Sequence, residues 1–322
     1  MLRSGENIWS EALEFVANSD QITLYSAYIK VDVLARLNVE KKINRIVVRW
    51  ELRDLHQGAS DLELYEYCKA NNIALFRNTR IHLKCMSNEK GEVLLGSANI
   101  SQRGINSLGD NYNYELNSFN QDLKFADELY LNRILAKSEY VTEELFLKIK
   151  HSLSALEDYK QDDVYSHIEV ESIKTKADYF LISELPMFFD ASELYNGSQN
   201  IESLSILDRK CIIHDLATYG ISSELEHEEF YIELKAIFNN HPFIIALKEQ
   251  IINDRRQSMG YGAVVRWITE HTTSVPTPIS WELKEKQVVN ILYEWITFFD
   301  QDFTVETPRH SQVIFYRKNK QT

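Results

Sequence analysis

The first 150 residues alternate between short runs of β-branched residues and segments with apolar residues at helical spacing, and this alternation restricts the possible folds more than any other feature. Ile43–Trp50 is the clearest of the β-branched runs, and such a run is typical of a strand buried within a sheet. Segments with helical spacing separate it from similar runs on both sides. A chain with this order is expected to form an α/β layered sheet with flanking helices.

The same patterns predict individual elements in the first half. Helices are expected over 7–16, 31–37, 60–70 and 123–136, and strands over 21–28, 43–50, 73–76, 81–86, 92–96 and 112–116. Ser87–Gly91 carries the residues of a turn and would join two of the strands as a hairpin.

The second half has a different pattern. After the polar stretch Glu157–Asp163, helical spacing predominates, at 230–238, 242–252, 262–270 and 281–299, and Phe303–Tyr316 has the pattern of a hairpin with a basic tip. Helices closed by a hairpin are typical of a winged helix. We therefore expect two domains, an α/β domain over 1–156 and a mainly helical α+β domain over 164–322.

Charge is distributed unevenly along the chain. The formal net charge is −13, yet residues 1–150 hold 19 Lys and Arg against 21 Asp and Glu. Most of the excess negative charge therefore lies in residues 151–322. A protein whose whole surface binds nucleic acid is disfavoured, while a local positive cleft in the first half is compatible with these numbers.

The cysteines and the N-terminus bear on the compartment. Three cysteines without metal-ligand or redox spacing fit a reducing environment in which each is a core residue: Cys68, Cys85 and Cys211. The N-terminus has no signal-peptide pattern and no apolar run is long enough for a membrane span. We expect a soluble, cytoplasmic protein that does not bind membranes.

One hairpin gathers the side chains of a phosphate site. His82 and Lys84 share a face of the predicted strand, and the next strand ends in Gly96-Ser97-Ala98-Asn99. An imidazole can attack phosphorus, and an ammonium, a hydroxyl and an amide can hold its oxygens. A glycine lets the backbone approach a ligand closely. The hairpin therefore predicts a site for phosphodiester chemistry.

The spacing of His-x-Lys at 82–84, Glu89 and Gly-Ser-x-Asn at 96–99 resembles the HKD motif of the phospholipase D superfamily. Glu89 stands where the motif usually has Asp, and in that superfamily this acid is structural, so we expect Glu89 to be a turn or structural residue. The resemblance spans roughly residues 20–120 and is to the nuclease-type branch, which also places an acid in a later strand. Glu115 matches that acid.

The resemblance implies roles for these residues. His82 would be the nucleophile that forms a covalent phosphohistidine. Lys84, Ser97 and Asn99 would bind the phosphate oxygens, and Glu115 would orient an imidazole or tune its basicity. No metal or cofactor would be required. Because the superfamily uses two such motifs per site and this chain has one His-x-Lys, the second histidine would come from a second copy in a homodimer.

The resemblance favours a metal-independent DNA endonuclease of a restriction or antiviral defence type, with a C-terminal domain that recognises the substrate or binds a regulatory partner protein. Two alternatives stay open. The substrate could be a phospholipid or another small phosphodiester, or the chain could be a non-catalytic assembly subunit with a vestigial site.

Several other residues have a functional and an ordinary interpretation. Four arginines could line a phosphate-binding cleft or simply be solvated: Arg49, Arg53, Arg77 and Arg80. The basic residues near the hairpin tip and at the C-terminus fit a solvated tail better than a nucleic-acid contact: Arg309, His310, Arg317, Lys318 and Lys320. A second Gly-Ser-x-Asn, at Gly197–Asn200, has no His-x-Lys ahead of it, so we expect it to be a loop.

Overall fold

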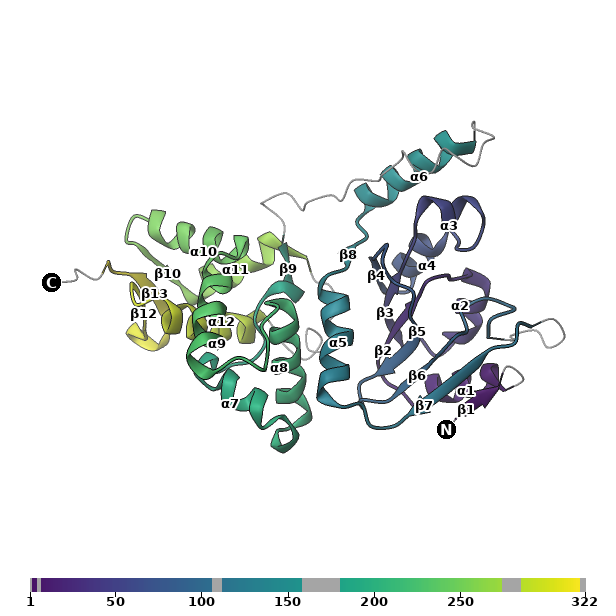
Figure 1. Cartoon of the computed structure of the whole chain (residues 1–322). Coiled ribbons are helices and arrows are strands. Elements are labelled where there is room, and N and C mark those ends of the chain that lie inside the picture. Colours follow the sequence, from purple (N-terminus) through teal and green to yellow (C-terminus); the bar gives the residue numbers. More distant parts are fainter. Residues whose placement is uncertain (1, 5–6, 106–111, 158–179, 274–284, 319–322) are drawn as a thin grey trace. The chain divides into compact units, whose positions relative to one another are not determined.

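The computed structural model describes residues 2–4, 7–105, 112–157, 180–273 and 285–318, and Figure 1 traces the whole chain. Contacts group the chain into two compact units, one of residues 1–127 and 137–174, the other of 128–136 and 175–322. The polar stretch predicted as a junction lies, from residue 158 onward, outside the described residues. Among the described helices, none combines the length and apolarity that crossing a bilayer requires.

An eight-stranded mixed sheet forms the centre of the first unit, in the order β1-β7-β6-β5-β2-β3-β4-β8 (Figure 1). Among the described strands of this sheet, the neighbours that pair in parallel are β2 with β3 and β3 with β4. The strands are β1 (Leu2–Ser4), β2 (Ile22–Ser26), β3 (Ile43–Val48), β4 (Ala74–Arg77), β5 (Lys84–Asn88), β6 (Val93–Gly96), β7 (Leu116–Asn120) and β8 (Glu139–Tyr140). The predicted α/β sheet is confirmed.

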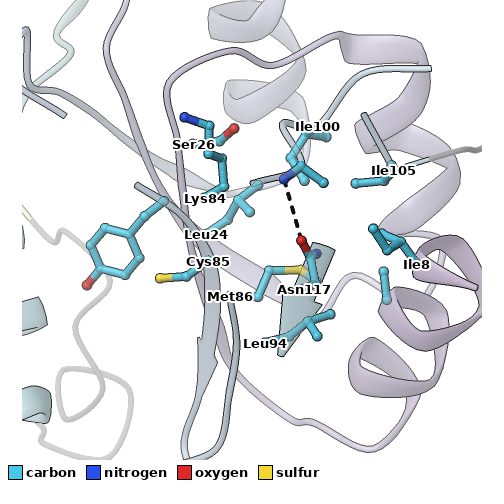
Figure 2. Close-up of a pocket in the computed structure, with 13 residues that line it drawn as sticks. Ile8, Leu24, Ser26, Lys84, Cys85, Met86, Leu94, Ile100, Ile105 and Asn117 are labelled. Carbon is cyan, nitrogen blue, oxygen red and sulfur yellow. Dashed lines mark hydrogen bonds between the residues drawn. The ribbon is translucent and has the colours of Figure 1, made fainter. Parts of the chain in front are cut away.

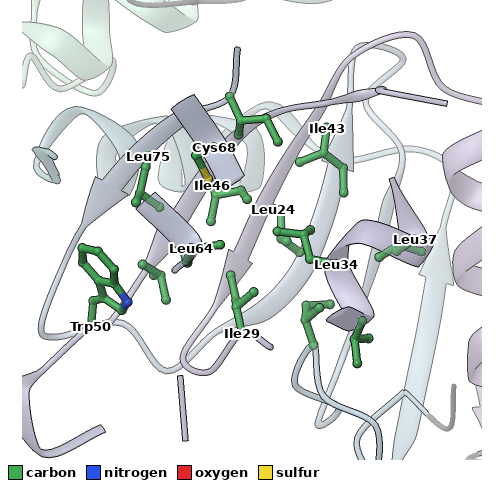
Figure 3. Packing of buried hydrophobic residues seen from close by; sticks show 14 of the residues in the cluster. Leu24, Ile29, Leu34, Leu37, Ile43, Ile46, Trp50, Leu64, Cys68 and Leu75 are labelled. Carbon is green, nitrogen blue, oxygen red and sulfur yellow. The ribbon is translucent and has the colours of Figure 1, made fainter. Parts of the chain in front are cut away.

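One apolar core lies on one face of this sheet. Leu24, Ile46 and Leu75 are paired across β2, β3 and β4, so their side chains point to the same face. Figure 3 shows them packed with Leu34 and Cys68 from two of the helices. The helices that contribute to this core are α1 (Ile8–Ala17), α2 (Val31–Leu37), α3 (Leu52–His56), α4 (Leu64–Ala70) and α6 (Glu143–Glu157).

The second unit is mainly helical, as predicted. Its helices are the part of α5 (Phe125–Ala136) from Glu128 on, α7 (Leu194–Gln199), α8 (Ile206–Thr218), α9 (His227–Asn239), α10 (Pro242–Asn253), α11 (Tyr261–His271) and α12 (Glu285–Phe299). A short parallel pair joins β9 (Phe180–Leu181) to β11 (Thr272–Thr273). Residues 281–284 of the last predicted helix lie outside the described part.

The C-terminal hairpin is confirmed and belongs to a three-stranded sheet. β12 (Phe303–Glu306) and β13 (Val313–Tyr316) pair with each other, and β10 (Ser258–Gly260) adds to β13. The order α10-β10-α11-α12-β12-β13 is that of a winged helix. The helix in the recognition position, α12, buries one face, on which Val289, Leu292, Trp295 and Ile296 have no exposed surface. The opposite face of α12 carries exposed or half-buried residues, among them Lys286, Asn290 and Phe298. A recognition helix likewise presents an uncovered face to a DNA groove.

Candidate active site

The ends of five strands bring the predicted site residues to one edge of the sheet. Parallel strands β2 and β3 end at this edge, and β5, antiparallel to β2, begins there. Because β6 and β7 continue the antiparallel order, β6 ends and β7 begins at the same edge. Lys84 is the first residue of β5, Ser97 follows β6, and Glu115 precedes β7. Topology therefore gathers residues that are far apart in the sequence.

His82 lies just before β5 rather than within it, so the predicted strand 81–86 was wrong at its start. The ladder with β2 begins at the pair Ser26–Lys84, and Ser26 is the last residue of β2. Residues ahead of Lys84 thus have no strand to pair with. The His82 side chain is exposed and makes no hydrogen bond to any residue that the structure describes. Its imidazole is free to meet a ligand.

Lys84 is half-buried beside Ser26, as Figure 2 shows. Its Nζ donates a hydrogen bond to the backbone carbonyl of His82 (2.8 Å), which ties the two motif residues together. Burial lowers the pKa of Lys84, and the nearby positive charge of Arg49 lowers it further, while the carboxylate of Glu115 acts in the opposite direction. Lys84 therefore lies within electrostatic reach of both residues.

Ser97 and Glu115 contact each other directly. The Ser97 hydroxyl donates to Oε2 of Glu115 and accepts a hydrogen bond from the backbone N–H of Leu116 (3.1 Å). Asn113 donates to the other carboxylate oxygen (3.4 Å). The strand predicted over 112–116 instead begins at Leu116, so Glu115 lies on the connection ahead of β7. Its hydrogen-bond partners are Ser97 and Asn113, with no bond to His82.

Asn99 connects the motif to the end of β2. Its Oδ1 accepts hydrogen bonds from the backbone N–H of Tyr28 (3.3 Å) and from the Ser26 hydroxyl (3.4 Å). Its amide nitrogen has no hydrogen-bond partner among the described residues, which leaves both of its N–H donors for a ligand. An added Cβ at Gly104 would lie 2.3 Å from the Asn99 carbonyl oxygen, so a glycine there permits this close turn.

Position 96 has no room for a side chain, because atoms of the neighbouring strand β7 lie too close. A Cβ at this position would lie 2.0 Å from Oδ1 of Asn117 and 2.4 Å from the carbonyl oxygen of Leu116. The same Asn117 oxygen accepts a long hydrogen bond from the Ala98 N–H (3.5 Å), drawn as a dashed line in Figure 2. Glycine thus lets β6 run close to β7 immediately before Ser97.

A small pocket lies beside these residues. Lys84, Ser26 and Asn117 supply its polar lining, and the rest is mainly apolar: Ile8, Leu24, Met86, Leu94, Ile100 and Ile105. Leu24, Met86 and Leu94 project from the sheet toward Ile8 of α1 (Figure 2). The apolar side chains pack beside the motif residues and contain no group that could act as an acid, a base or a nucleophile.

The four arginines considered in the sequence differ in their surroundings. Arg49 makes two hydrogen bonds to Asp54, at 2.7 and 2.6 Å, and a third to the Tyr28 hydroxyl (2.6 Å). Arg77 is buried against the Trp50 carbonyl and Glu139, so it does not line an open cleft. Arg53 and Arg80 are exposed. Tyr28 and Asp54 were not singled out in the sequence, although Tyr28 closely follows β2 at the edge where the motif gathers.

Glu89 is confirmed as a structural residue. Its Oε2 accepts hydrogen bonds from the backbone N–H groups of Asp20 (3.1 Å) and Gln21 (2.9 Å), just ahead of β2. It follows β5 and so lies at the opposite end of that strand from Lys84. The departure from Asp at this position leaves the site residues untouched.

The second Gly-Ser-x-Asn is helical, so the predicted loop was wrong. Gly197 and Ser198 lie within α7, where the Ser198 hydroxyl donates to the Tyr195 carbonyl (2.7 Å) and is buried. The three cysteines are buried free thiols, as predicted. Of the described residues, no group of three or more His, Cys, Asp or Glu is arranged to hold a metal ion.

No protein-family model matches the sequence, and no curated protein matches it significantly. Solved structures do match. Nuc from Salmonella typhimurium, a phospholipase D family member, is 14% identical, with a TM-score of 0.34 over 44% of this chain and 99% of that one. NucT from Helicobacter pylori is 14% identical, with a TM-score of 0.30 over 49% of this chain and 94% of that one.

Phosphatidylserine synthase from Haemophilus influenzae is 16% identical, with a TM-score of 0.36 over 49% of this chain and 43% of that one. Each of these three matches covers less than half of this chain.

Proposed function

We propose that this chain is a metal-independent phosphodiesterase, and specifically a DNA endonuclease. The observation that carries the proposal is that the segments with His82, Lys84, Ser97, Asn99 and Glu115 meet at one edge of the sheet. Arg49, Arg53 and Arg80 lie in segments at the same edge, and their positive charge suits a polyanionic substrate. A phosphate bound there would meet a free imidazole.

The first chemical step would be attack by a His82 ring nitrogen on phosphorus. A P–N bond forms as the P–O bond to the leaving alcohol breaks, and the leaving oxygen takes a proton from a general acid. Lys84 and the free amide of Asn99 hold the non-bridging oxygens as negative charge shifts onto them. In the second step water attacks phosphorus, the same acid–base group takes its proton, and the P–N bond breaks to release a phosphomonoester.

The acid–base group would be His82 of the partner subunit, in a homodimer with one shared site. Three apolar side chains around the site are well exposed and suit such a contact: Leu95 at 38%, Leu116 at 52% and Tyr114 at 100%. Leu95 and Leu116 lie on one face of adjacent strands, because Leu95 pairs with Ser118. A second copy would cover this surface and complete the site.

The biological setting we propose is restriction or antiviral defence. The second unit would recognise DNA or bind a regulatory protein.

Cleavage of plasmid DNA in excess EDTA tests the reaction. We expect the wild-type protein to nick or linearise the plasmid, and the His82→Ala variant to be inactive. His151→Ala is the matched control, since His151 is exposed on α6 outside the site. Acid-labile labelling of the wild-type protein, absent from His82→Ala, would identify the covalent intermediate. Activity retained by His82→Ala, or abolished by EDTA, would rule the mechanism out.

Molar mass in solution tests the shared site. We expect a dimer, and we expect the double variant Tyr114→Asp and Leu116→Asp to be monomeric and inactive because it charges the proposed contact. Full activity in a strictly monomeric protein would contradict the shared site while leaving the phosphodiesterase proposal in place.

A further inference from the structure

Arg49 is held in a single orientation next to the phosphate site. It follows β3 directly, and its guanidinium makes a bidentate pair with Asp54, which is 4% exposed. The Tyr28 hydroxyl accepts a third hydrogen bond (2.6 Å), and the guanidinium carbon lies 4.8 Å from the centre of the Tyr28 ring. Such a clamp removes most of the side-chain entropy that an arginine would otherwise lose on binding an anion.

One nitrogen of this guanidinium is left for a ligand. Nε and one terminal nitrogen make the bonds to Asp54 and Tyr28, whereas Nη1 makes none to any described residue. Nη1 is also absent from the buried polar atoms that lack a partner, so solvent reaches it. Arg49 therefore presents two unpaired N–H groups at the edge of the sheet.

Tyr28 joins Arg49 to the motif. Its backbone N–H is bound by Asn99, its carbonyl oxygen accepts from the Ser26 hydroxyl (2.8 Å), and its ring hydroxyl binds Arg49. The strand register sets the distance between Arg49 and Lys84. Lys84, Ser26 and Val48 are paired across β5, β2 and β3, and Arg49 follows Val48, so Arg49 lies about two strand spacings, on the order of 10 Å, from Lys84 along the edge. The lowered pKa of Lys84 agrees with a cation at this range.

We propose that Arg49 binds a second phosphate of the substrate, next to the one that His82 attacks. This inference rests on the proposed function and deepens it, since it assigns the substrate to phosphodiesters that carry a further phosphate along the same strand. A polynucleotide has that repeat, whereas a diester with a single phosphate leaves Arg49 without an anion. Arg49 would thus favour polynucleotides over small diesters.

The decisive measurement compares two substrates of one chemistry. Thymidylyl-thymidine has one phosphate, and the same dinucleotide with an added terminal phosphate has two. We expect the double variant Arg49→Gln and Asp54→Asn to lower the ratio of kcat/KM for the two-phosphate over the one-phosphate substrate by about tenfold, as for the loss of one charge-assisted hydrogen bond. Removing both partners avoids leaving the buried Asp54 charge without its partner.

Arg77→Gln is the matched control. Arg77 occupies the corresponding end of β4 and is likewise paired with a carboxylate, yet it is buried against Trp50 and Glu139. We expect it to leave the substrate ratio unchanged. An equal loss on both substrates in the Arg49 variant, or the same ratio change in Arg77→Gln, would overturn the second phosphate site.

Binding distinguishes this inference from the proposed function. Fluorescence anisotropy with labelled oligothymidylate, in a His82→Ala background, requires no cleavage. We expect the Arg49 and Asp54 substitutions to weaken binding and to reduce the slope of log affinity against log salt by about 1. An unchanged slope would overturn the inference even if the wild-type protein cleaves DNA. A reduced slope would support it even if cleavage proceeds by another route.

Discussion

The hydroxyl of Ser97 donates its one proton to the carboxylate of Glu115 and accepts the N–H of Leu116 at 3.1 Å. In the unliganded protein this proton is therefore committed to Glu115. In the proposed site, a phosphate oxygen could receive this proton only if the hydroxyl turned away from the carboxylate, so substrate binding would be coupled to the Ser97–Glu115 contact.

Replacing Ser97 with Ala removes one of the donors that we propose bind the phosphate. We expect kcat/KM on a phosphodiester to fall by about 10²-fold, the usual loss for a single donor to a developing negative charge. Ser97 is exposed, so thermal stability is expected to stay close to that of the wild type. Ser97→Thr keeps the hydroxyl and serves as the control. Similar activity in Ser97→Ala and the wild type would exclude Ser97 from phosphate binding.

Replacing Glu115 with Gln is expected to move the alkaline limb of the pH–rate profile to lower pH. The Glu115 carboxylate raises the pKa of Lys84, against burial and Arg49, which lower it. Loss of that negative charge lowers the pKa of Lys84 further, so the ammonium loses its proton at lower pH. The profile of kcat/KM against pH reports this. In Lys84→Arg, whose cation stays charged, the limb should disappear. If the alkaline limb stays at the same pH in Glu115→Gln, the Glu115 carboxylate does not influence the titration that limits activity.

Replacing Glu89 with Ala is expected to destabilise the protein without a matching loss of activity. Two backbone N–H groups, of Asp20 and Gln21, lose their acceptor, and we expect the free energy of unfolding to fall by about 1–3 kcal/mol. Urea denaturation measures this change, with Lys90→Ala as an exposed neighbouring control. A stable but inactive Glu89→Ala protein would instead assign this acid to the chemistry.

Replacing Gly96 with Ala is expected to cost about 1–3 kcal/mol of stability through overpacking and to reduce activity by displacing Ser97. The new Cβ would lie 2.0 Å from Asn117 Oδ1 and 2.4 Å from a backbone oxygen. Gly260→Ala is the matched control, because a Cβ there has no heavy atom within 4 Å. Equal melting temperatures for the two variants would mean that β6 and β7 can separate.

The sequence predicted the elements that local pattern determines. β2 and β3 are buried on both faces, and their β-branched and apolar runs indicated this directly. Most helices were predicted to within a few residues, since their apolar spacing is local. Four of the described helices were not predicted. The short α3 and α7 have too few residues for a period, whereas α6 and α8 were missed although they are long.

Strand ends depend on distant partners and were predicted less well. β5 begins at Lys84 because β2 ends at Ser26, and β7 begins at Leu116, which pairs with Ser4 of a strand that was not predicted. The motif spacing predicted which residues meet at the edge. It could not predict that Glu115 bonds to Ser97, because this contact depends on where β7 starts.

The path of helix α5 has a consequence for the modularity of the protein. Residues 128–136 belong by contact to the second unit, where Glu128 pairs with Arg209 (2.9 Å) and Arg133 donates to the Ile221 carbonyl (2.9 Å), while 137–174 return to the first unit. The chain thus passes between the units three times. No single truncation yields a complete unit without residues of the other, and a recombination event with one crossover would separate a helix from its partners. We therefore expect the two units to be inherited and exchanged together.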